Sequence, residues 1–246
     1  MLAATQLGYY SIPRDLMLRV QSVVNPIITR VAFPLIAEVQ MDTDRVRSIY
    51  LQTLNMTAST NAPIYMGVAF FAHEIVAVLL GSGWEQSVNI LQILALWCGL
   101  RSTGNPVGSL LLGMGKASLA LKWNLGLLLV VPPAIWLGSQ YGPVGMAYAL
   151  LMVQLVLFVP GWFILVRPVC HARLGEYSVA ALRPLLLSIM AILPAWYVAS
   201  SVDMTLARIS IGVFVSMPLY LGLSYFFNRK WLTAMLELAG RRAVTG

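Results

Sequence analysis

The chain has 246 residues, of which 59% are hydrophobic and only 10% are charged, and its mean hydropathy is +0.79. This composition excludes a soluble globular domain, in which about a quarter of the residues are charged. The formal net charge of +7 could suit nucleic acid, but the basic residues stand between apolar runs of about twenty residues, the length that crosses a bilayer. We therefore expect an all-α integral membrane protein with no nucleic-acid partner.

Taken in chain order, the apolar runs predict about seven transmembrane helices. The expected spans are residues 8–39, 62–80, 88–112, 117–138, 144–166, 184–201 and 206–227. Residues 1–166 then hold five helices, and residues 167–246 hold a basic loop, two further helices and a cytoplasmic basic tail. Locally, Asp44 is the expected N-cap of the second helix, and the pair Pro132 and Pro133 should interrupt the fourth span.

The loop charges predict the orientation of the chain. Under the positive-inside rule, short loops rich in Lys and Arg stay in the cytoplasm. The first, third and fifth loops and the tail carry eleven basic residues, whereas the opposite side carries only Arg208. We therefore expect a periplasmic N-terminus and a cytoplasmic C-terminus.

The first expected span is unusual because it carries charges at membrane depth. A charge near the bilayer centre costs at least about 2.5–3.5 kcal/mol on insertion scales, so such residues normally face a bundle interior or a watery cavity. Arg19 and Arg30 lie within about 20° of each other on an ideal helix. Asp15 precedes Arg19 by four residues, the spacing at which opposite charges meet on one helix face. This span thus predicts a polar, basic wall in which Asp15 orients Arg19.

Four arginines within the expected spans are the candidate binding residues, namely Arg14, Arg19, Arg30 and Arg101. At about 1.5 Å per residue, Arg19 and Arg101 fall near the midplane of a roughly 30 Å hydrocarbon core. A functional role is expected for these two, with purely structural pairing as the alternative. Arg14 and Arg30 lie nearer the span ends, where snorkelling to the interface explains them equally well.

Motifs for catalysis, metals or cofactors do not emerge from the sequence. The segment 113–116 lacks the first glycine and the final Ser or Thr of a phosphate-binding loop, and His73-Glu74 begins a zinc-protease pattern that fails at Ala77. Glu74 is a candidate for coupling to protons, with an interfacial surface position as the alternative. We expect no catalytic residues, no metal and no cofactor, and the chain is not expected to be an enzyme.

Several motifs resemble the polysaccharide exporter and O-antigen flippase family, within the multidrug, oligosaccharidyl-lipid and polysaccharide transporter superfamily. They are LGYYS at residues 7–11, FP at 33–34, LLGSGWEQSVNILQILAL at 79–96 and GSLLLGMGKASL at 108–119. Colanic-acid-exporter-like proteins look most similar. Members have about fourteen helices in two lobes, and LGYYS normally opens the eighth. The resemblance therefore implies helices 8–14 only, the C-terminal half, which agrees with the expected periplasmic N-terminus.

The resemblance implies flipping of undecaprenyl-pyrophosphate-linked oligosaccharide repeat units across the bacterial inner membrane, for surface polysaccharide biosynthesis. The implied partners are the lipid-linked oligosaccharide, membrane lipids and a separate N-terminal half, because one lobe cannot enclose a cavity alone. Arginine suits this substrate, since guanidinium binds phosphate oxygens in a bidentate manner and stays charged. The four arginines are accordingly expected to bind the anionic headgroup.

Two alternative functions remain open from the sequence. A multidrug or small-molecule exporter of the same superfamily should favour carboxylates and aromatic residues in its site. A membrane enzyme acting on polyprenyl-linked sugars should carry a catalytic carboxylate or histidine in a sizeable loop. The longest expected loop, residues 167–183, offers only His171 and Glu176 for such chemistry.

Overall fold

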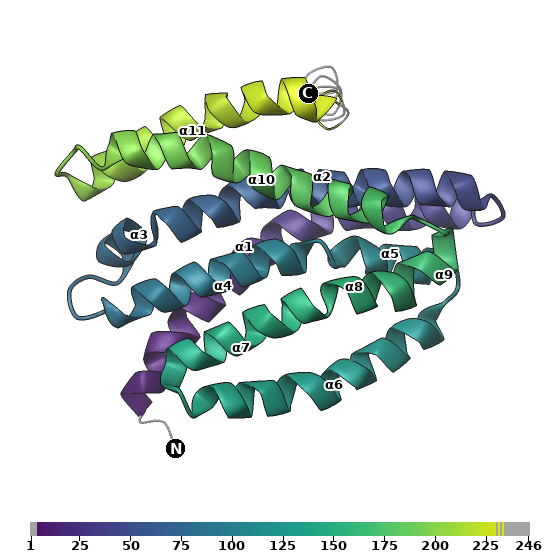
Figure 1. Ribbon diagram of the computed structural model, residues 1–246, viewed down its shortest axis with the longest axis horizontal. Coiled ribbons are helices and arrows are strands. Elements are labelled where there is room, and N and C mark those ends of the chain that lie inside the picture. The colour runs from purple at the N-terminus through teal and green to yellow at the C-terminus, as the bar shows by residue number, and fades with distance from the viewer. Residues whose placement is uncertain (1–3, 230, 232, 234–246) are drawn as a thin grey trace.

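The computed structural model describes residues 4–229, 231 and 233, and it describes no side chain for residues 4–7 and 23–31. Every regular element among the described residues is a helix (Figure 1), as the sequence predicts. The elements are α1 (Ala4–Glu38), α2 (Thr43–Phe70), α3 (Ala72–Leu79), α4 (Gln86–Ser102), α5 (Asn105–Gly113), α6 (Ala117–Ser139), α7 (Gly142–Val156), α8 (Phe158–Gly161), the π-helical η1 (Trp162–Val166), α9 (Arg167–Cys170), α10 (Leu174–Ala199) and α11 (Thr205–Phe227).

These helices follow the seven expected apolar runs, but three of the runs are broken. α2 and α3 meet at 76°, and α7 meets the segment 158–170 at 44°. α4 and α5 are separate helices, and Pro106 lies in the first turn of α5, where its missing N–H costs no helical hydrogen bond. By length and apolar composition, three described helices could cross a membrane (α6, α10 and α11), or up to five segments if each bent pair counts as one span. The count of seven spans is not confirmed.

Three local predictions are wrong. α6 runs unbroken through Pro132 and Pro133. A break in this apolar helix would leave further backbone N–H and C=O groups without partners, because no water is available there to bind them. Asp42, not Asp44, caps α2, since the helix begins at Thr43 and the Arg45 N–H donates to Asp42 Oδ1 at 3.1 Å. The expected loop 167–183 is helical except at residues 171–173.

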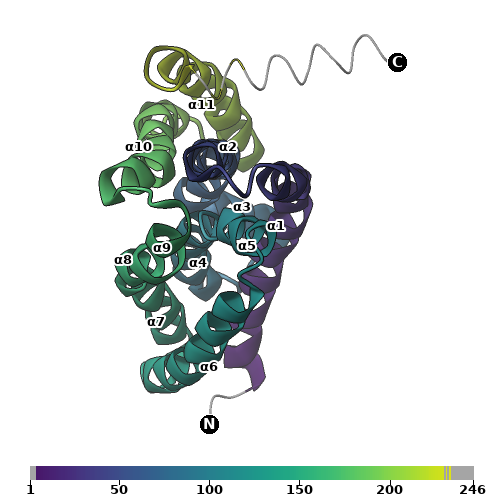
Figure 2. The ribbon, with the colours of Figure 1, turned by 90° about the vertical axis from the view of Figure 1, so that its right-hand side faces the viewer.

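The turns alternate between the two ends of the helix bundle. In Figure 1 the α1–α2, α5–α6 and α9–α10 turns lie at one end, and the α3–α4, α6–α7 and α10–α11 turns lie at the other. Figure 2 shows α6 and α11 at opposite extremes, with α2, α4 and α5 between them. The basic turns of the sequence therefore all belong to the same end.

The start of α1 is attached to the α3–α4 turn. The Tyr9 ring packs edge-on against Trp84 with ring centres 5.2 Å apart, and Ser87 Oγ donates to the Tyr9 carbonyl at 3.1 Å. Within the turn, the Gly83 N–H donates to Glu85 Oε1 at 3.0 Å, and this hydrogen bond lowers the pKa of Glu85. Two stretches that carry the family resemblance, LGYYS and LLGSGW, therefore meet in space.

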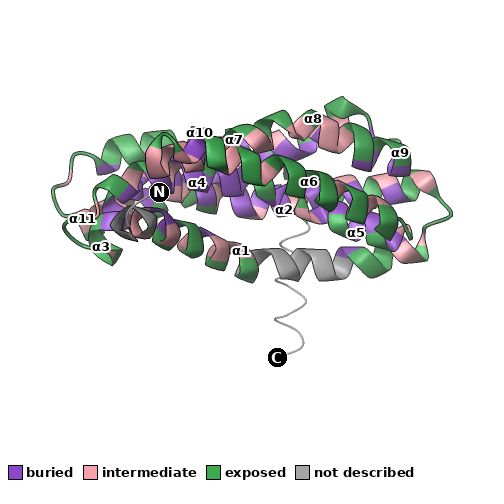
Figure 3. Cartoon of the chain, turned by 90° about the horizontal axis from the view of Figure 1, so that it is seen from below, coloured by how far each residue is buried: buried purple, intermediate pink, exposed green. Residues whose placement is uncertain are grey.

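A close crossing of α6 and α7 sets α6 apart from the core. A Cβ on Gly138 would lie 2.6 Å from the Gly145 carbonyl oxygen, so only glycine permits this approach. Gly138 is the buried residue of α6, and the rest of that helix is exposed or half-buried (Figure 3). α6 is thus held against α7 near one end, and farther along it forms one wall of the cavity described next.

Candidate functional site

A cavity of about 630 Å³ lies between α1 and the helices α4 to α8. This volume is within the roughly 300–1,000 Å³ range of small-molecule sites. Its polar and aromatic lining residues are Tyr10, Arg14, Trp97, Arg101, Thr103, Asn105, Trp123, Asn124, Gln154, Phe158 and Tyr177. Much of the remaining wall is apolar, and among the described residues that line the cavity none is acidic. The cavity is therefore cationic.

Arg101 reaches this cavity from the last turn of α4. Its guanidinium carbon lies 4.8 Å from the centre of the Trp97 ring, one helical turn earlier, which is a cation–π contact. A positive charge at a helix C-terminus is also favoured by the backbone dipole. No ion pair of the described residues includes Arg101. The side chain is thus held in place without a counter-charge from any described residue, which suits it to an anionic ligand.

Arg14 reaches the same cavity from α1. It forms an ion pair with the adjacent Asp15 at 3.7 Å, and the two side chains are 46% and 63% exposed. Exposed pairs of this kind contribute little, typically about 0–1 kcal/mol. Arg14 is therefore readily available to a second anion, and it joins Arg101 as the candidate residues that the structure brings together.

The other predicted residues of α1 are placed differently. Arg19 is exposed and does not line the cavity. It is five residues after Arg14, about 140° around the helix, so the two side chains leave different faces. The expected Asp15–Arg19 pair does not occur among the ion pairs of the described residues, where Asp15 pairs with Arg14. The side chain of Arg30 lies outside the described residues.

Glu74 lies away from the cavity, in the first turn of α3. Its side chain is 8% exposed and accepts a hydrogen bond from Arg208 of α11, with 3.3 Å between Oε1 and the guanidinium nitrogen. Arg208 also donates to the carbonyls of Val202 and Ser200. Glu74 is therefore buried in an ion pair that joins α3 to α11, and a coupling role for it stays a prediction.

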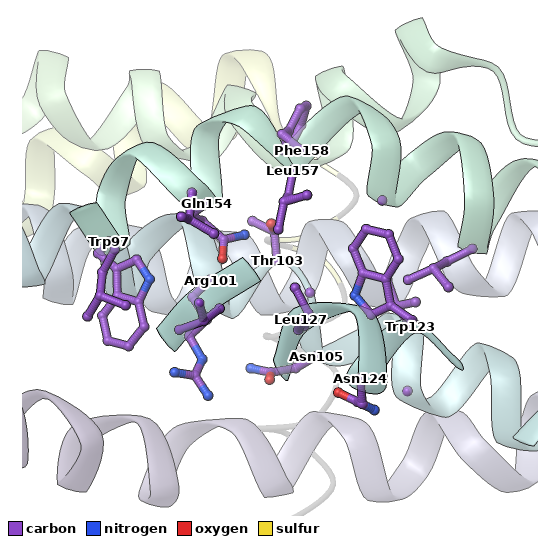
Figure 4. Close-up of a pocket in the computed structure, with 18 of the residues that line it drawn as sticks. Trp97, Arg101, Thr103, Asn105, Trp123, Asn124, Leu127, Gln154, Leu157 and Phe158 are labelled. Atoms are coloured by element: carbon purple, nitrogen blue, oxygen red, sulfur yellow. The ribbon is translucent and has the colours of Figure 1, made fainter. Parts of the chain in front are cut away.

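The cavity residues that are neither charged nor on α1 were not predicted from the sequence. Asn105, Asn124 and Gln154 come from α5, α6 and α7, and Figure 4 shows them with Trp97 and Trp123 around the same space. The available signal was a polar amide inside an otherwise apolar run, which membrane proteins normally turn toward a cavity or a partner helix. That signal identifies Asn124 and Gln154. It does not identify the tryptophans, because tryptophan side chains often pack between helices of a membrane protein without binding a ligand.

A second cavity of about 450 Å³ lies between α2, α10 and α11. Its lining is mostly apolar, for example Ile64, Val68, Ile192 and Met217, and no charged residue belongs to it in the described part of the chain. One of its hydroxyls is satisfied within the protein, since Tyr220 donates to the Ser59 carbonyl at 2.8 Å. This second cavity therefore offers no charged group to an anion, whereas a further pocket of about 370 Å³ at the α9–α10 turn is lined by Arg167, His171 and Arg173.

The fold and the first cavity define a multi-pass membrane protein with a cationic, ligand-sized chamber. Residues 1–89 match the family described as "Polysaccharide biosynthesis protein". The chain belongs to the polysaccharide exporter family that its motifs resemble.

Three curated bacterial relatives show the extent of the similarity. The lipopolysaccharide biosynthesis protein WzxC of Escherichia coli K12 is 30% identical over 189 residues, 76% of this chain and 38% of the relative. The teichuronic acid biosynthesis protein TuaB of Bacillus subtilis is 29% identical over 76% of this chain and 39% of the relative. An uncharacterized membrane protein in the cps region of Klebsiella pneumoniae is 27% identical over 87% and 44%. The chain thus spans less than half the length of these relatives. No solved structure matches it.

Proposed function

We propose that this chain forms one lobe of an exporter that flips undecaprenyl-pyrophosphate-linked oligosaccharide units across the bacterial inner membrane. The observation that carries the proposal is the placement of Arg14 and Arg101 in one cavity of about 630 Å³ whose described lining holds no carboxylate. Relatives named for lipopolysaccharide and teichuronic acid biosynthesis support polysaccharide as the cargo.

The proposed role of the cavity is to replace the water around the pyrophosphate as it crosses the membrane. Guanidinium groups donate paired hydrogen bonds to phosphate oxygens and remain charged at any relevant pH. Arg101, held over Trp97, is the proposed central contact, and Arg14 is the proposed contact nearer the start of α1. Arg19 and Arg30 remain proposed contacts along α1, with Asp15 and Glu74 as orienting or coupling groups.

The cavity chemistry favours this proposal over the two alternatives. An exporter of cationic drugs needs acidic lining residues, and the described lining offers arginines instead. A sugar-transferring enzyme needs a catalytic loop, but the expected loop is reduced to residues 171–173, and the Glu176 carboxylate accepts the Arg173 N–H at 2.9 Å at the start of α10. An anion carrier is thus the function that the described residues support best.

We further propose seven membrane crossings with a periplasmic N-terminus and a cytoplasmic C-terminus. The gathering of the basic turns at one end of the bundle supports this orientation (Figure 1). Reporter fusions after Lys116 and between Ala172 and Arg173 should both report the cytoplasm, and a fusion after Ser82 should report the periplasm. A periplasmic signal after Lys116 contradicts the orientation.

The corresponding region of the relatives is less than half of their length, so we propose that transport needs a second lobe. In a strain without its own exporter, the chain expressed alone should not restore surface polysaccharide. Co-expression with the remaining part of a relative such as WzxC should restore it, and an Arg101→Ala variant should not. Restoration by the chain alone contradicts the two-lobe proposal, and full activity of Arg101→Ala contradicts the anion site.

A further inference from the structure

The cavity has two chemically different ends. Arg101 and Trp97 lie at one end, and Trp123 lies at the other with Asn124, while Asn105 lies between the two ends and Gln154 lies on the side of Arg101 (Figure 4). No charged residue of α5 or α6 is among the described residues that line the cavity. The second end therefore offers aromatic and amide groups only, and these do not suit a phosphate as well as the arginines do.

Asn105, between the two ends, has an unpaired hydrogen-bond donor. It is the first residue of α5, directly after the break that follows Arg101, and its side-chain Nδ2 is buried without a hydrogen-bond partner. A buried N–H group without an acceptor costs free energy. An oxygen atom of a bound ligand that reaches this nitrogen would remove that cost, which makes Asn105 a candidate ligand contact.

Two further amides complement Asn105. Asn124 donates its Nδ2 to the Ala120 carbonyl at 2.9 Å, which leaves its Oδ1 as an acceptor. Gln154 lines the cavity from α7, and its side-chain amide makes no hydrogen bond to another described residue. The three amides therefore supply both donors and acceptors. A sugar hydroxyl can pair with such a set because it donates one hydrogen bond and accepts others.

Trp123 supplies an aromatic surface that Trp97 does not. The Trp97 ring carries the Arg101 guanidinium, whereas no cation lies over Trp123 among the described residues. The indole of Trp123 packs against α8. A Cβ placed on Gly161 of α8 would lie 3.7 Å from Trp123 Cζ2, which is van der Waals contact. The C–H face of a pyranose ring is apolar and packs against an aromatic ring through dispersion and loss of water.

We propose that Trp123, Asn105, Asn124 and Gln154 form a carbohydrate subsite for a neutral pyranose that is attached to the diphosphate. The arginines hold the diphosphate at one end, and this subsite holds the first sugar between them and Trp123. The inference rests on the proposed function for the diphosphate and adds the residues that recognise the glycan. It makes the cavity selective for a glycosylated carrier over the bare carrier.

The test compares two soluble probes, farnesyl diphosphate and its glucosyl ester, which carries a hexose on the distal phosphate. Binding is measured by calorimetry on the purified full chain in lipid nanodiscs. The glucosyl ester should bind about tenfold more tightly than the sugar-free probe, as expected from one or two hydrogen bonds and one ring contact. Trp123→Ala and Asn105→Leu, neither of which changes the charge of the cavity, should abolish this ratio and leave the affinity for farnesyl diphosphate unchanged.

Matched variants separate recognition from packing. Trp123→Phe keeps an aromatic face and should retain most of the ratio, and Leu127→Ala, which alters an apolar residue of the same wall, should leave it intact. Equal affinity of the two probes for the unaltered chain overturns the subsite but not the proposed function. Failure of both probes to bind, or binding that Arg101→Gln does not weaken, overturns the proposed function itself.

Discussion

Arg101 and Arg208 are both arginines of largely apolar helices, and they meet opposite surroundings. Arg208 is neutralised by Glu74 at 3.3 Å and donates to two backbone carbonyls, so its charge joins α11 to α3. Among the described residues, Arg101 has the Trp97 ring at 4.8 Å and no acidic partner, and it faces the cavity. An arginine whose hydrogen bonds are made within the protein is structural, and one without an acidic partner is available to a ligand.

The largest effect should come from removing the available charge. Arg101→Gln should weaken binding of farnesyl diphosphate by roughly 10- to 100-fold, because a hydrogen bond to a charged group contributes about 1.5–3 kcal/mol. Arg101→Lys should lose less, since it keeps the charge but not the paired donors. Calorimetry on the purified chain measures both. Arg208→Gln is the matched control and should leave the affinity unchanged, whereas an equal loss in both variants removes the distinction between the two arginines.

The α3–α11 junction should be sensitive to packing as well as to charge. A Cβ on Gly212 of α11 would overlap the ring of Phe71, at the bend between α2 and α3. Gly212→Ala should therefore lower the free energy of unfolding by about 1–3 kcal/mol, measured by SDS titration in mixed micelles. Gly222→Ala on the same helix is the control, because a Cβ there meets no atom within 4 Å. A smaller effect at Gly212 than at Gly222 contradicts the close packing.

Breaking the internal ion pair should cost somewhat less. Glu74→Gln leaves Arg208 without a counter-charge, and because the Arg208 side chain is 30% exposed we expect a loss of about 1–2 kcal/mol, below the value for a fully buried pair. The double variant with Arg208→Gln should be nearly as stable as the single variants. If the two single effects simply add in the double variant, the pair does not contribute to stability.

The smallest effect concerns the two aspartates of the α1–α2 turn. Asp42 has a backbone partner, the Arg45 N–H, whereas Asp44 pairs only with the Arg47 side chain at 3.1 Å and is 86% exposed. Asp42→Ala should cost about 1 kcal/mol as the loss of an N-cap. Asp44→Ala should cost only a few tenths of a kcal/mol, as for an exposed pair. The reverse order in the same SDS titration contradicts the cap at Asp42.

The amino-acid sequence by itself determined the class of the protein and the order of its helices. Apolar runs separated by basic turns require helices, because a bilayer provides no partners for unpaired backbone groups. The motifs at residues 7–11 and 79–96 were enough to indicate the family, which the comparisons confirm. Depth along a span singled out Arg19 and Arg101, since depth depends only on position in the sequence, but of these two only Arg101 lines the cavity.

Only the tertiary structure decided which charges face one another. Helical spacing placed Asp15 beside Arg19, but the structure pairs Asp15 with Arg14 and turns Arg14 into the cavity. The partner of Glu74 is 134 residues away on α11, and the amides of α5, α6 and α7 line one space only because those helices pack around it. Periodicity specifies the face on which a side chain lies. It carries no information on which helix packs against that face, because that depends on how all the helices pack together.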